Sequence, residues 1–234
     1  MNWCARLPRD VGVIVVAAGQ GTRVGGDVPK QYRVIAGVPL LLRAIRPFSS
    51  HPDVCHIVVV VPPADMDTPP GWLVEATGAR LQLAAGGASR RASVAAGLAA
   101  LPLECSVVLV HDGARPFPPA SVIDGGIAVA RAGHSAVPAV PLADTLKRAD
   151  SCGIVLGTVP RTGLWRVQTP QAFPRGVLER AHAQTQPEGL EATDDAMLVE
   201  LYGGRVELIP STVRNLKVTT PEDLVFATWL ATAP

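Results

Sequence analysis

The sequence predicts an α/β fold: a single Rossmann-like, mainly parallel sheet covered by helices on both faces, with a protruding β-hairpin arm. Apolar, β-branched runs without charge recur along the chain, as expected of strands buried on both faces. Helical segments alternate with these runs, which favours parallel strands joined by crossover helices. The chain of 234 residues is long enough to bury a sizeable core. We therefore expect one domain over residues 1–234, with the arm at about 137–167.

The first half of the chain alternates strands and helices. Val11–Ala18 is the first expected strand, and a helix follows from Pro39, because proline is favoured in the first turn of a helix. Cys55–Val61 is a second apolar strand. Asp65–Gly78 is polar and interrupted by prolines, which indicates a short helix within a loop, and Leu81–Ala84 is a short strand.

The second half continues the same alternation. Ser89 is a favourable N-cap for an alanine-rich helix that runs to Leu101. Further strands are expected at Val107–Val110 and Ser135–Leu142. The last part of the chain is expected to contain helices near Arg175–Gln184 and Asp194–Tyr202, a strand at Arg205–Ile209 and a helix from Pro221.

The segment between the strand at Ser135–Leu142 and the helix near Arg175 has the pattern of a β-hairpin. Asp144–Arg148 and Ile154–Val159 are the two expected strands, and Asp150–Gly153 is the turn. A hairpin this polar and short cannot form its own core, and isolated hairpins are only marginally stable in water. We expect it to project as an arm and to pack against a second subunit of a homodimer. The alternative is a hairpin folded over its own domain.

Composition and charge exclude several classes of partner. The formal net charge is +1, so no overall charge favours nucleic acid or an anionic membrane surface. The four cysteines, Cys4, Cys55, Cys105 and Cys152, lack metal-ligand spacing and are expected to be buried free thiols. The N-terminus lacks an apolar signal core, and no apolar run approaches the ~18–20 residues of a membrane span. We expect a cytoplasmic protein.

The stretch from Val13 to Tyr32 has the pattern of a triphosphate-binding loop. It begins as a buried strand and then changes to small, flexible residues: Ala17, Ala18, Gly19, Gly21, Gly25 and Gly26. Glycines allow a ligand to approach the backbone closely, and successive amides in such a turn form a concave anion site. Arg23 and Lys30 lie within the reach of one loop. A purely structural turn is the alternative.

Two commoner glycine-rich loops fit this stretch poorly. A Walker A loop ends in Gly-Lys-Ser/Thr, whereas Gly26 is followed by Asp27. The dinucleotide fingerprint needs a third small residue where Val24 stands. It also needs an acidic residue at the end of the second strand, which here runs into Pro62 and Pro63.

Two more candidate positions follow strands. The segment Gly86–Ser93 lies between a strand and a helix, where backbone groups, the Ser93 hydroxyl and a helix N-terminus are available to a ligand, although a simple turn is the alternative. Asp112 follows a buried strand, and a single carboxylate completed by phosphate oxygens is a common way to hold Mg²⁺. Ligands bind beyond the carboxyl ends of parallel strands, so these positions and the glycine-rich loop are expected to meet.

Several motifs resemble those of the GT-A-like nucleotidyltransferases and, among them, the 2-C-methyl-D-erythritol 4-phosphate cytidylyltransferase family. They are Ala17-Ala-Gly-x-Gly-x-Arg23 with Pro29-Lys30-Gln31, Gly86-Gly-x-x-Arg-x-x-Ser93-Val, His111-Asp-x-Ala-Arg-Pro, Arg161-x-x-Leu with Gln168-Thr-Pro-Gln, and Asn215-Leu-Lys-Val-Thr. The resemblance covers most of the chain. It departs from the family pattern at Gly113, where alanine is usual, and at Pro160 and Arg214, where acidic residues are usual.

This resemblance implies transfer of a cytidylyl group from CTP to 2-C-methyl-D-erythritol 4-phosphate, with release of pyrophosphate, in isoprenoid precursor biosynthesis by the non-mevalonate pathway. Mg²⁺ is the implied cofactor, and a homodimer through the arm is the implied assembly. The implied catalytic residues are Arg23, Lys30 and Lys217. The nucleotide-binding residues would be Ala17, Ala18, Gly19, Gly21, Gly87, Ala88 and Ser93, with Asp112 as the metal ligand. The acceptor-binding residues would be Thr145, Arg161, Arg115, Thr169 and Thr193, with Arg161 reaching across the dimer.

Such a reaction requires no protein nucleophile, because the acceptor phosphate is itself the attacking group and is ionised near neutral pH. His111 is therefore interpreted as structural, and Thr193 is either an N-cap or a ligand contact. The site must instead overcome repulsion between anions, which is ~4 kcal/mol for unit charges 4 Å apart near a protein surface. Two alternatives remain at this point: cytidylyl transfer to another polyol phosphate such as ribitol 5-phosphate, and a nucleotide-binding sensor without catalysis.

Overall fold

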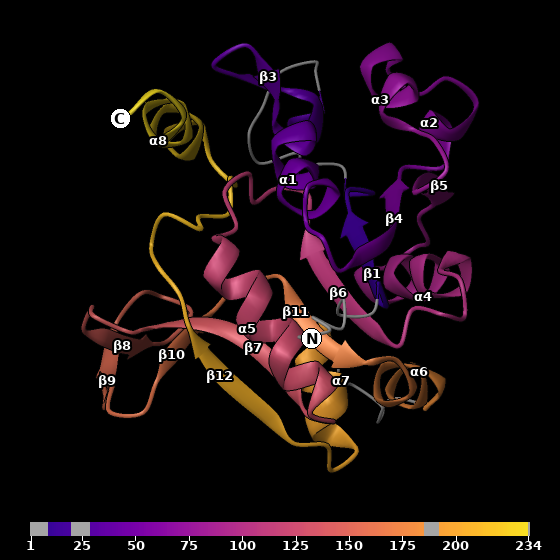
Figure 1. Cartoon of the computed structure of the whole chain (residues 1–234). Helices are drawn as coiled ribbons and strands as arrows, with labels where there is room; N and C mark the ends of the chain where they lie inside the picture. The colour runs from indigo at the N-terminus through magenta and orange to yellow at the C-terminus, as the bar shows by residue number, and fades with distance from the viewer. Residues whose placement is uncertain (1–8, 20–28, 185–191, 234) are drawn as a thin grey trace, which may run out of the picture.

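Uncharged apolar runs form the centre of a mixed, mostly parallel sheet in the computed structural model, which describes residues 9–19, 29–184 and 192–233 (Figure 1). The parallel strands are β1 (Val11–Val16), β4 (Val54–Val61), β5 (Leu81–Ala85) and β6 (Val107–Asp112). On the far side of β6 lie β11 (Gln171–Pro174), β7 (Ser135–Pro141), β10 (Trp165–Val167) and β12 (Val206–Pro210). Strands β10 and β11 run antiparallel to β7, whereas β12 is parallel to it.

Helices cover both faces of this sheet, as the sequence predicts. In β1, Val13 and Val15 pack on one face with α1 (Leu40–Ser49) and α5 (Ala120–Arg131). Ile14 points to the opposite face, which is covered by three helices: α4 (Arg90–Ala100), α6 (Arg175–Ala183) and α7 (Asp195–Leu201). The alternation of a strand thus gives two apolar cores from one uncharged run.

Most expected elements are confirmed, with small changes at their ends. Ser89 caps α4, because its side chain accepts the Ala92 amide at 3.1 Å. The proline-broken loop holds two short helices, α2 (Ala64–Asp67) and α3 (Gly71–Ala76). The last helix, α8, runs Pro221–Thr232. The small elements near the first loop are η2 (Lys30–Tyr32), β2 (Val34–Ile35) and β3 (Val38–Pro39). The sequence analysis predicts neither α5 nor β11.

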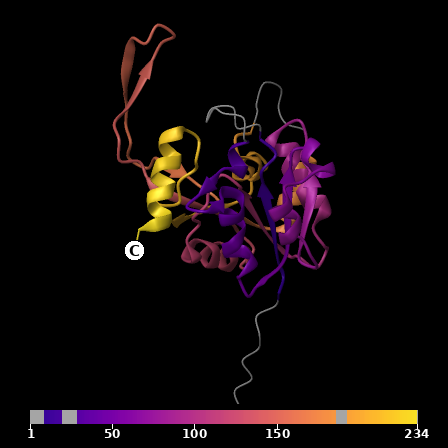
Figure 2. The same cartoon turned by 90° about the horizontal axis from the view of Figure 1, so that it is seen from above.

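The expected hairpin is present as β8 (Leu146–Ala149) and β9 (Val155–Val159), a two-stranded sheet separate from the main one. It extends away from the body of the chain (Figure 2). The segment 137–167 also includes main-sheet residues of β7 and β10 at its two ends.

The cysteines differ in their surroundings. Cys105 is buried and Cys55 is partly buried, and both are free thiols, as expected. Cys152 lies exposed in the hairpin, which corrects the expectation of a buried thiol there, since an arm without a core cannot bury it. Cys4 lies outside the described residues.

The register of the central strands brings the candidate loops to one edge of the sheet. Val16 of β1 pairs with Asp112 on one side and with Val60 on the other. Val61 in turn pairs with Ala85. The segments that follow β1, β4, β5 and β6 therefore start side by side at the carboxyl edge, where ligands of parallel sheets bind.

Candidate active site

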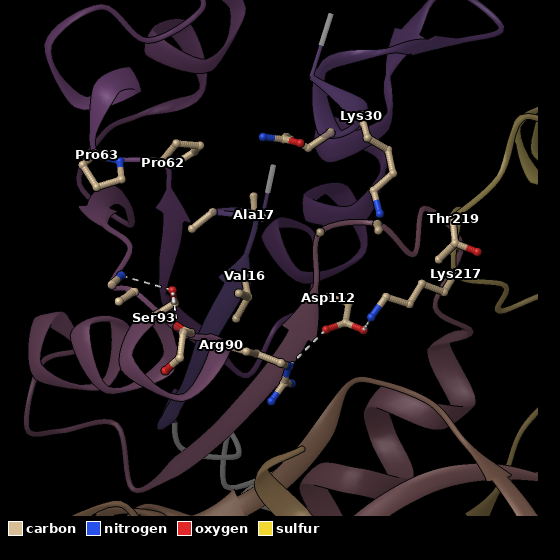
Figure 3. Close-up of a pocket in the computed structure, with 18 residues that line it drawn as sticks. Val16, Ala17, Lys30, Pro62, Pro63, Arg90, Ser93, Asp112, Lys217 and Thr219 are labelled. Carbon is tan, nitrogen blue, oxygen red and sulfur yellow. Dashed lines mark hydrogen bonds and ion pairs between the residues drawn. The ribbon is translucent and has the colours of Figure 1, made fainter. Parts of the chain in front are cut away.

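A cavity of about 660 Å³ opens at this carboxyl edge (Figure 3). Nine of the residues singled out in the sequence line it together: Ala17, Ala18, Gly19, Lys30, Gly87, Ala88, Ser93, Asp112 and Lys217. Gly21 and Arg23 lie outside the described residues. A cavity of this size is typical of small-ligand sites.

The glycine pair after β5 allows this loop to pass close to its neighbours. A Cβ atom on Gly86 would lie 2.3 Å from the Cβ of Ala18, and one on Gly87 would lie 2.5 Å from the Cβ of Ala92. Ser93 holds the same loop, because its hydroxyl accepts the Gly87 amide at 3.2 Å and donates to the Ser89 carbonyl at 2.9 Å. Glycine is thus needed here for space, and Ser93 has a structural role whether or not it also contacts a ligand.

Asp112 at the end of β6 is the electrostatic centre of the cavity. Its Oδ2 lies 2.9 Å from Nζ of Lys217 and 3.8 Å from Nε of Arg115, and its Oδ1 lies 3.6 Å from Nε of Arg90. Burial alone would raise the pKa of this carboxyl group, but Lys217, Arg90 and Arg115 hold the pKa well below its usual range. Asp112 is therefore ionised at neutral pH.

Lys217 reaches this carboxylate because a buried asparagine anchors its segment. The Asn215 amide donates to Oε1 of Gln168 and to the Thr169 carbonyl, both at 3.0 Å. Three residues beyond Asn215, the Val218 amide donates to the Ala114 carbonyl at 2.9 Å. These bonds fix the backbone on both sides of Lys217, so its side chain enters the cavity from the C-terminal part of the chain.

Thr169 and Arg115, both expected at the acceptor, are buried beneath the cavity. Thr169 Oγ1 accepts the Asp112 amide at 3.0 Å and lies 3.1 Å from Nδ1 of His111. The other ring nitrogen of His111 lies 2.9 Å from the Arg115 carbonyl, so His111 is fully engaged within the fold. The Arg115 guanidinium donates to the Asn215 carbonyl at 2.7 Å, while its buried Nε has no hydrogen-bond partner among the described residues.

Arg90 is a cavity residue that the sequence analysis does not select. It is the first residue of α4, and Nη1 donates to Oδ2 of Asp195 at 2.7 Å. Its place in the motif Gly86-Gly-x-x-Arg90 is the one available signal, because its acidic partners are distant in sequence. Figure 3 shows Arg90 and Lys217 approaching Asp112 from opposite sides.

The remaining candidates lie outside the cavity. Thr193 is exposed, and Asp194 rather than Thr193 is the N-cap of α7, because the Asp194 side chain accepts the Met197 amide. Thr145 and Arg161 are exposed at the base of the arm, where Arg161 donates to the Ala143 carbonyl. The structure thus groups the expected nucleotide and metal residues, and leaves these three acceptor candidates apart from them.

The donor set at Asp112 fits a magnesium ion that arrives with a nucleotide. Among the described residues no group of three or more His, Cys, Asp or Glu side chains could hold a metal on its own. Asp112 is the one acidic side chain among the described residues that line the cavity. A single ionised carboxylate beside room for phosphates is the arrangement in which Mg²⁺ keeps phosphate and water ligands.

No helix in the described parts of the chain is long and apolar enough to cross a membrane.

Comparison with known proteins relates the chain to one family. The family model described as 2-C-methyl-D-erythritol 4-phosphate cytidylyltransferase matches residues 11–232. The enzyme of that name from Carboxydothermus hydrogenoformans is 40% identical over 223 residues, covering 95% of both chains. The one from Geotalea uraniireducens is 42% identical, covering 93% of this chain and 94% of the relative.

A solved structure supports the same relationship. The crystal structure of 2-C-methyl-D-erythritol 4-phosphate cytidylyltransferase from Thermus thermophilus is 36% identical with a TM-score of 0.79, and the match covers 95% of this chain and 98% of that one. The region matched by the family model includes all the motifs that line the cavity. With a family model over nearly its whole length, and with relatives above 30% identity over nine-tenths of it, the chain belongs to the 2-C-methyl-D-erythritol 4-phosphate cytidylyltransferase family.

Proposed function

We propose that the chain transfers the cytidylyl group of CTP to 2-C-methyl-D-erythritol 4-phosphate in isoprenoid precursor biosynthesis. An oxygen of the acceptor phosphate attacks the α-phosphate of CTP, the bond to the β-phosphate breaks, and pyrophosphate leaves. The observation that carries this proposal is the Asp112–Lys217 pair inside a glycine-lined cavity, in a member of this family. The two alternatives, a different polyol phosphate and a sensor, are not favoured by the relatives.

The cations around the cavity supply the electrostatic part of the reaction. The acceptor phosphate must approach the triphosphate of CTP, and each of these two groups carries more than one negative charge, so their repulsion exceeds the ~4 kcal/mol of a unit pair at 4 Å. Lys30 and Lys217 line the cavity and are assigned to the α-phosphate and the leaving group, together with Arg23 of the first loop. Positioning and charge stabilisation dominate such transfers, and no protein nucleophile is needed.

Mg²⁺ is assigned as the cofactor and would neutralise charge on the triphosphate when it is bound. Asp112 is the residue of the chain that would hold it, for the reasons of charge and surroundings given above. The base and ribose are assigned to the loop segments of Ala17–Gly19 and Gly87–Ser93, which also line the cavity. Arg115 and Thr169 are also assigned to the acceptor. Thr169 accepts the Asp112 amide at the end of β6, and Arg115 donates to the Asn215 carbonyl in the segment of Lys217.

The acceptor is assigned to a composite site between two copies of the chain. Thr145 and Arg161 lie on the arm and do not line the described cavity of their own chain. The arm and its base expose a set of apolar side chains: Leu146, Ile154, Val155, Leu156, Leu164, Trp165 and Val167. Apolar surface of this extent is typical of a protein interface. We therefore assign the chain to a homodimer in which Arg161 binds the acceptor phosphate in the partner's site, with Thr193 close to that phosphate. We also propose that each subunit is a single domain and that the protein is cytoplasmic.

Pyrophosphate release tests this function directly. The measurement pairs CTP, ATP, GTP or UTP with 2-C-methyl-D-erythritol 4-phosphate, ribitol 5-phosphate or unphosphorylated methylerythritol. We expect turnover with CTP and methylerythritol phosphate, and none with the unphosphorylated acceptor, because the phosphate is the nucleophile. Faster turnover with ribitol 5-phosphate than with 2-C-methyl-D-erythritol 4-phosphate would show that the assigned acceptor is wrong. CTP binding without pyrophosphate release would instead indicate a sensor.

A further inference from the structure

Asp195, the first residue of α7, is a carboxylate that is completely buried outside the cavity. Its Oδ2 accepts Nη1 of Arg90 at 2.7 Å, and its Oδ1 lies 2.9 Å from Nε2 of His182. A buried charge is costly unless it is paired and hydrogen-bonded. Both oxygens of Asp195 are engaged, so this carboxylate is a fixed anchor for the arginine beside it.

Arg90 lies between two carboxylates and binds them unequally. The bond to Asp195 has the length of a charge-assisted hydrogen bond, whereas Nε lies 3.6 Å from Oδ1 of Asp112, beyond hydrogen-bond distance. Burial alone would lower the pKa of Arg90, but Asp195 and Asp112 raise it, so the guanidinium stays charged. Without Asp195, an arginine at this position would be free to form a bidentate pair with the remaining carboxylate.

Such a pair would remove the open coordination position of the cavity. Oδ2 of Asp112 already has Nζ of Lys217 at 2.9 Å, whereas Oδ1 has Nε of Arg90 only at 3.6 Å. Oδ1 is therefore the oxygen that remains open to a cation from the cavity. Its availability depends on where the Arg90 guanidinium is held.

The scaffold around Asp195 fixes its position from two elements. Gln171 of β11 accepts the Ala196 amide at 3.1 Å and donates to Asp194 at 2.7 Å, which attaches the start of α7 to the sheet. His182 belongs to α6, which packs in the same apolar cluster as α7. The anchor is thus built into the sheet and the helix layer, away from the cavity loops.

We infer that Asp195 is a positioning residue that holds the Arg90 guanidinium away from Asp112, so that Oδ1 of Asp112 stays open to a divalent cation carried by the nucleotide. The inference rests on the proposed function only in that the cation is the one that accompanies CTP. It concerns Arg90 of α4 and Asp195 of α7, to which the sequence motifs assign no role.

A double-mutant cycle tests this inference by equilibrium binding. CTP binding is measured by titration calorimetry over a series of Mg²⁺ concentrations for the parent, Asp195→Asn, Arg90→Gln and the double variant. We expect Asp195→Asn to raise the Mg²⁺ concentration for half-maximal CTP binding about tenfold, the size typical of partners that orient a metal ligand. The double variant is expected to recover most of this loss, because the competing guanidinium is gone.

Controls separate this role from general damage to the fold. Arg91→Gln removes the neighbouring arginine of the same helix turn, which donates to the backbone carbonyls of His182 and Gln184, and should leave the Mg²⁺ dependence unchanged. Thermal unfolding of each variant reports on folding. If Asp195→Asn does not fold, Arg90→Gln alone still decides, because it should bind CTP at Mg²⁺ concentrations no higher than the parent requires.

Three outcomes would overturn the inference. They are a double variant as weak as Asp195→Asn, an Asp195→Asn variant that equals the parent, and a tenfold weakening in Arg90→Gln alone. The last would mean that Arg90 itself contributes to binding. Failure of the proposed function looks different, because the parent would then not bind CTP with Mg²⁺ or would release no pyrophosphate from it.

Discussion

Nζ of Lys217 lies 2.9 Å from Oδ2 of Asp112, which joins the last loop of the chain to the carboxyl end of β6. This contact pairs an exposed lysine with an aspartate that is only 8% exposed. When a substrate phosphate enters the cavity, Lys217 is already held in position by Asp112. The arrangement therefore provides a cation whose position is set before the substrate arrives, which is the basis of electrostatic preorganisation.

Lys217→Ala is expected to lower kcat/KM by about 100-fold or more, the usual cost of removing a preorganised group that stabilises charge. The variant should still unfold cooperatively, because Arg90 and Arg115 remain beside Asp112. Arg214→Ala is the matched control, since it removes an exposed cation of the same loop that does not line the cavity. Pyrophosphate release and thermal unfolding provide the two measurements. Near-parental turnover in folded Lys217→Ala would contradict the role.

Thr169→Val is expected to destabilise the fold, because two buried groups lose their partner. The Asp112 amide would have no acceptor, and Nδ1 of His111 would lose the hydroxyl beside it, at a cost of about 1–3 kcal/mol for each unsatisfied group. Thr169→Ser keeps the hydroxyl and serves as the control. Urea unfolding at neutral pH measures the difference. Equal free energies of unfolding in the two variants would show that the hydroxyl is not needed.

Protonation of His111 is expected to make stability depend on pH. Burial lowers the pKa of His111 to about 4, whereas an unfolded histidine has a pKa of about 6.5. Between these values the unfolded chain binds a proton that the folded chain does not. The free energy of unfolding therefore falls as the pH drops from about 6.5 to about 4, by up to about 1.4 kcal/mol per pH unit.

His111→Gln should reduce this dependence, because glutamine does not titrate. Urea unfolding at several pH values between 4 and 7 gives the difference in slope between the parent and the variant. The remaining histidines provide the shared background in both proteins. Parallel curves over this range would rule out His111 as the cause.

A mixing experiment tests the composite acceptor site. Lys30→Ala and Arg161→Ala are each expected to be inactive as homodimers, because every site lacks one of the two groups. When both variants are mixed and allowed to exchange subunits, a mixed dimer contains one intact site, so about a quarter of the parental activity should return at equal amounts. Sedimentation measures the assembly in parallel. A mixture that stays inactive although the subunits exchange would place both residues in one subunit's site.

The sequence is sufficient to predict the central strands and the loops that follow them. The run Val13–Val15 carries no charge and is buried on both faces of the sheet, so its burial could be read directly from its residues. Asp112 and the glycines of the first loop follow such runs, and parallel pairing brings strand ends together. For that reason half of the residues that line the cavity could be named as site residues without coordinates.

Elements defined by distant contacts could not be predicted in this way. β11 is only four residues long, and it becomes a strand by pairing with β6 and β7 rather than through its own periodicity. The pattern of α5 is interrupted by Gly125 and Gly126, which weaken a helical signal although Gly126 packs closely on Ala172. Arg90 was missed for the same reason, since Asp195 becomes its neighbour only through the packing of α7.

The order in which the chain is made gives the Lys217–Asp112 contact a consequence for biosynthesis. β1, β4 and β6 leave the ribosome well before the lysine does, so an emerging chain can build much of its sheet while the carboxylate at the tip of β6 still lacks its nearest cation. Translation that stops ahead of residue 217 would give a product with the scaffold but without this half of the charge pair. The charge pair at the end of β6 can therefore form only after residue 217 has been synthesised.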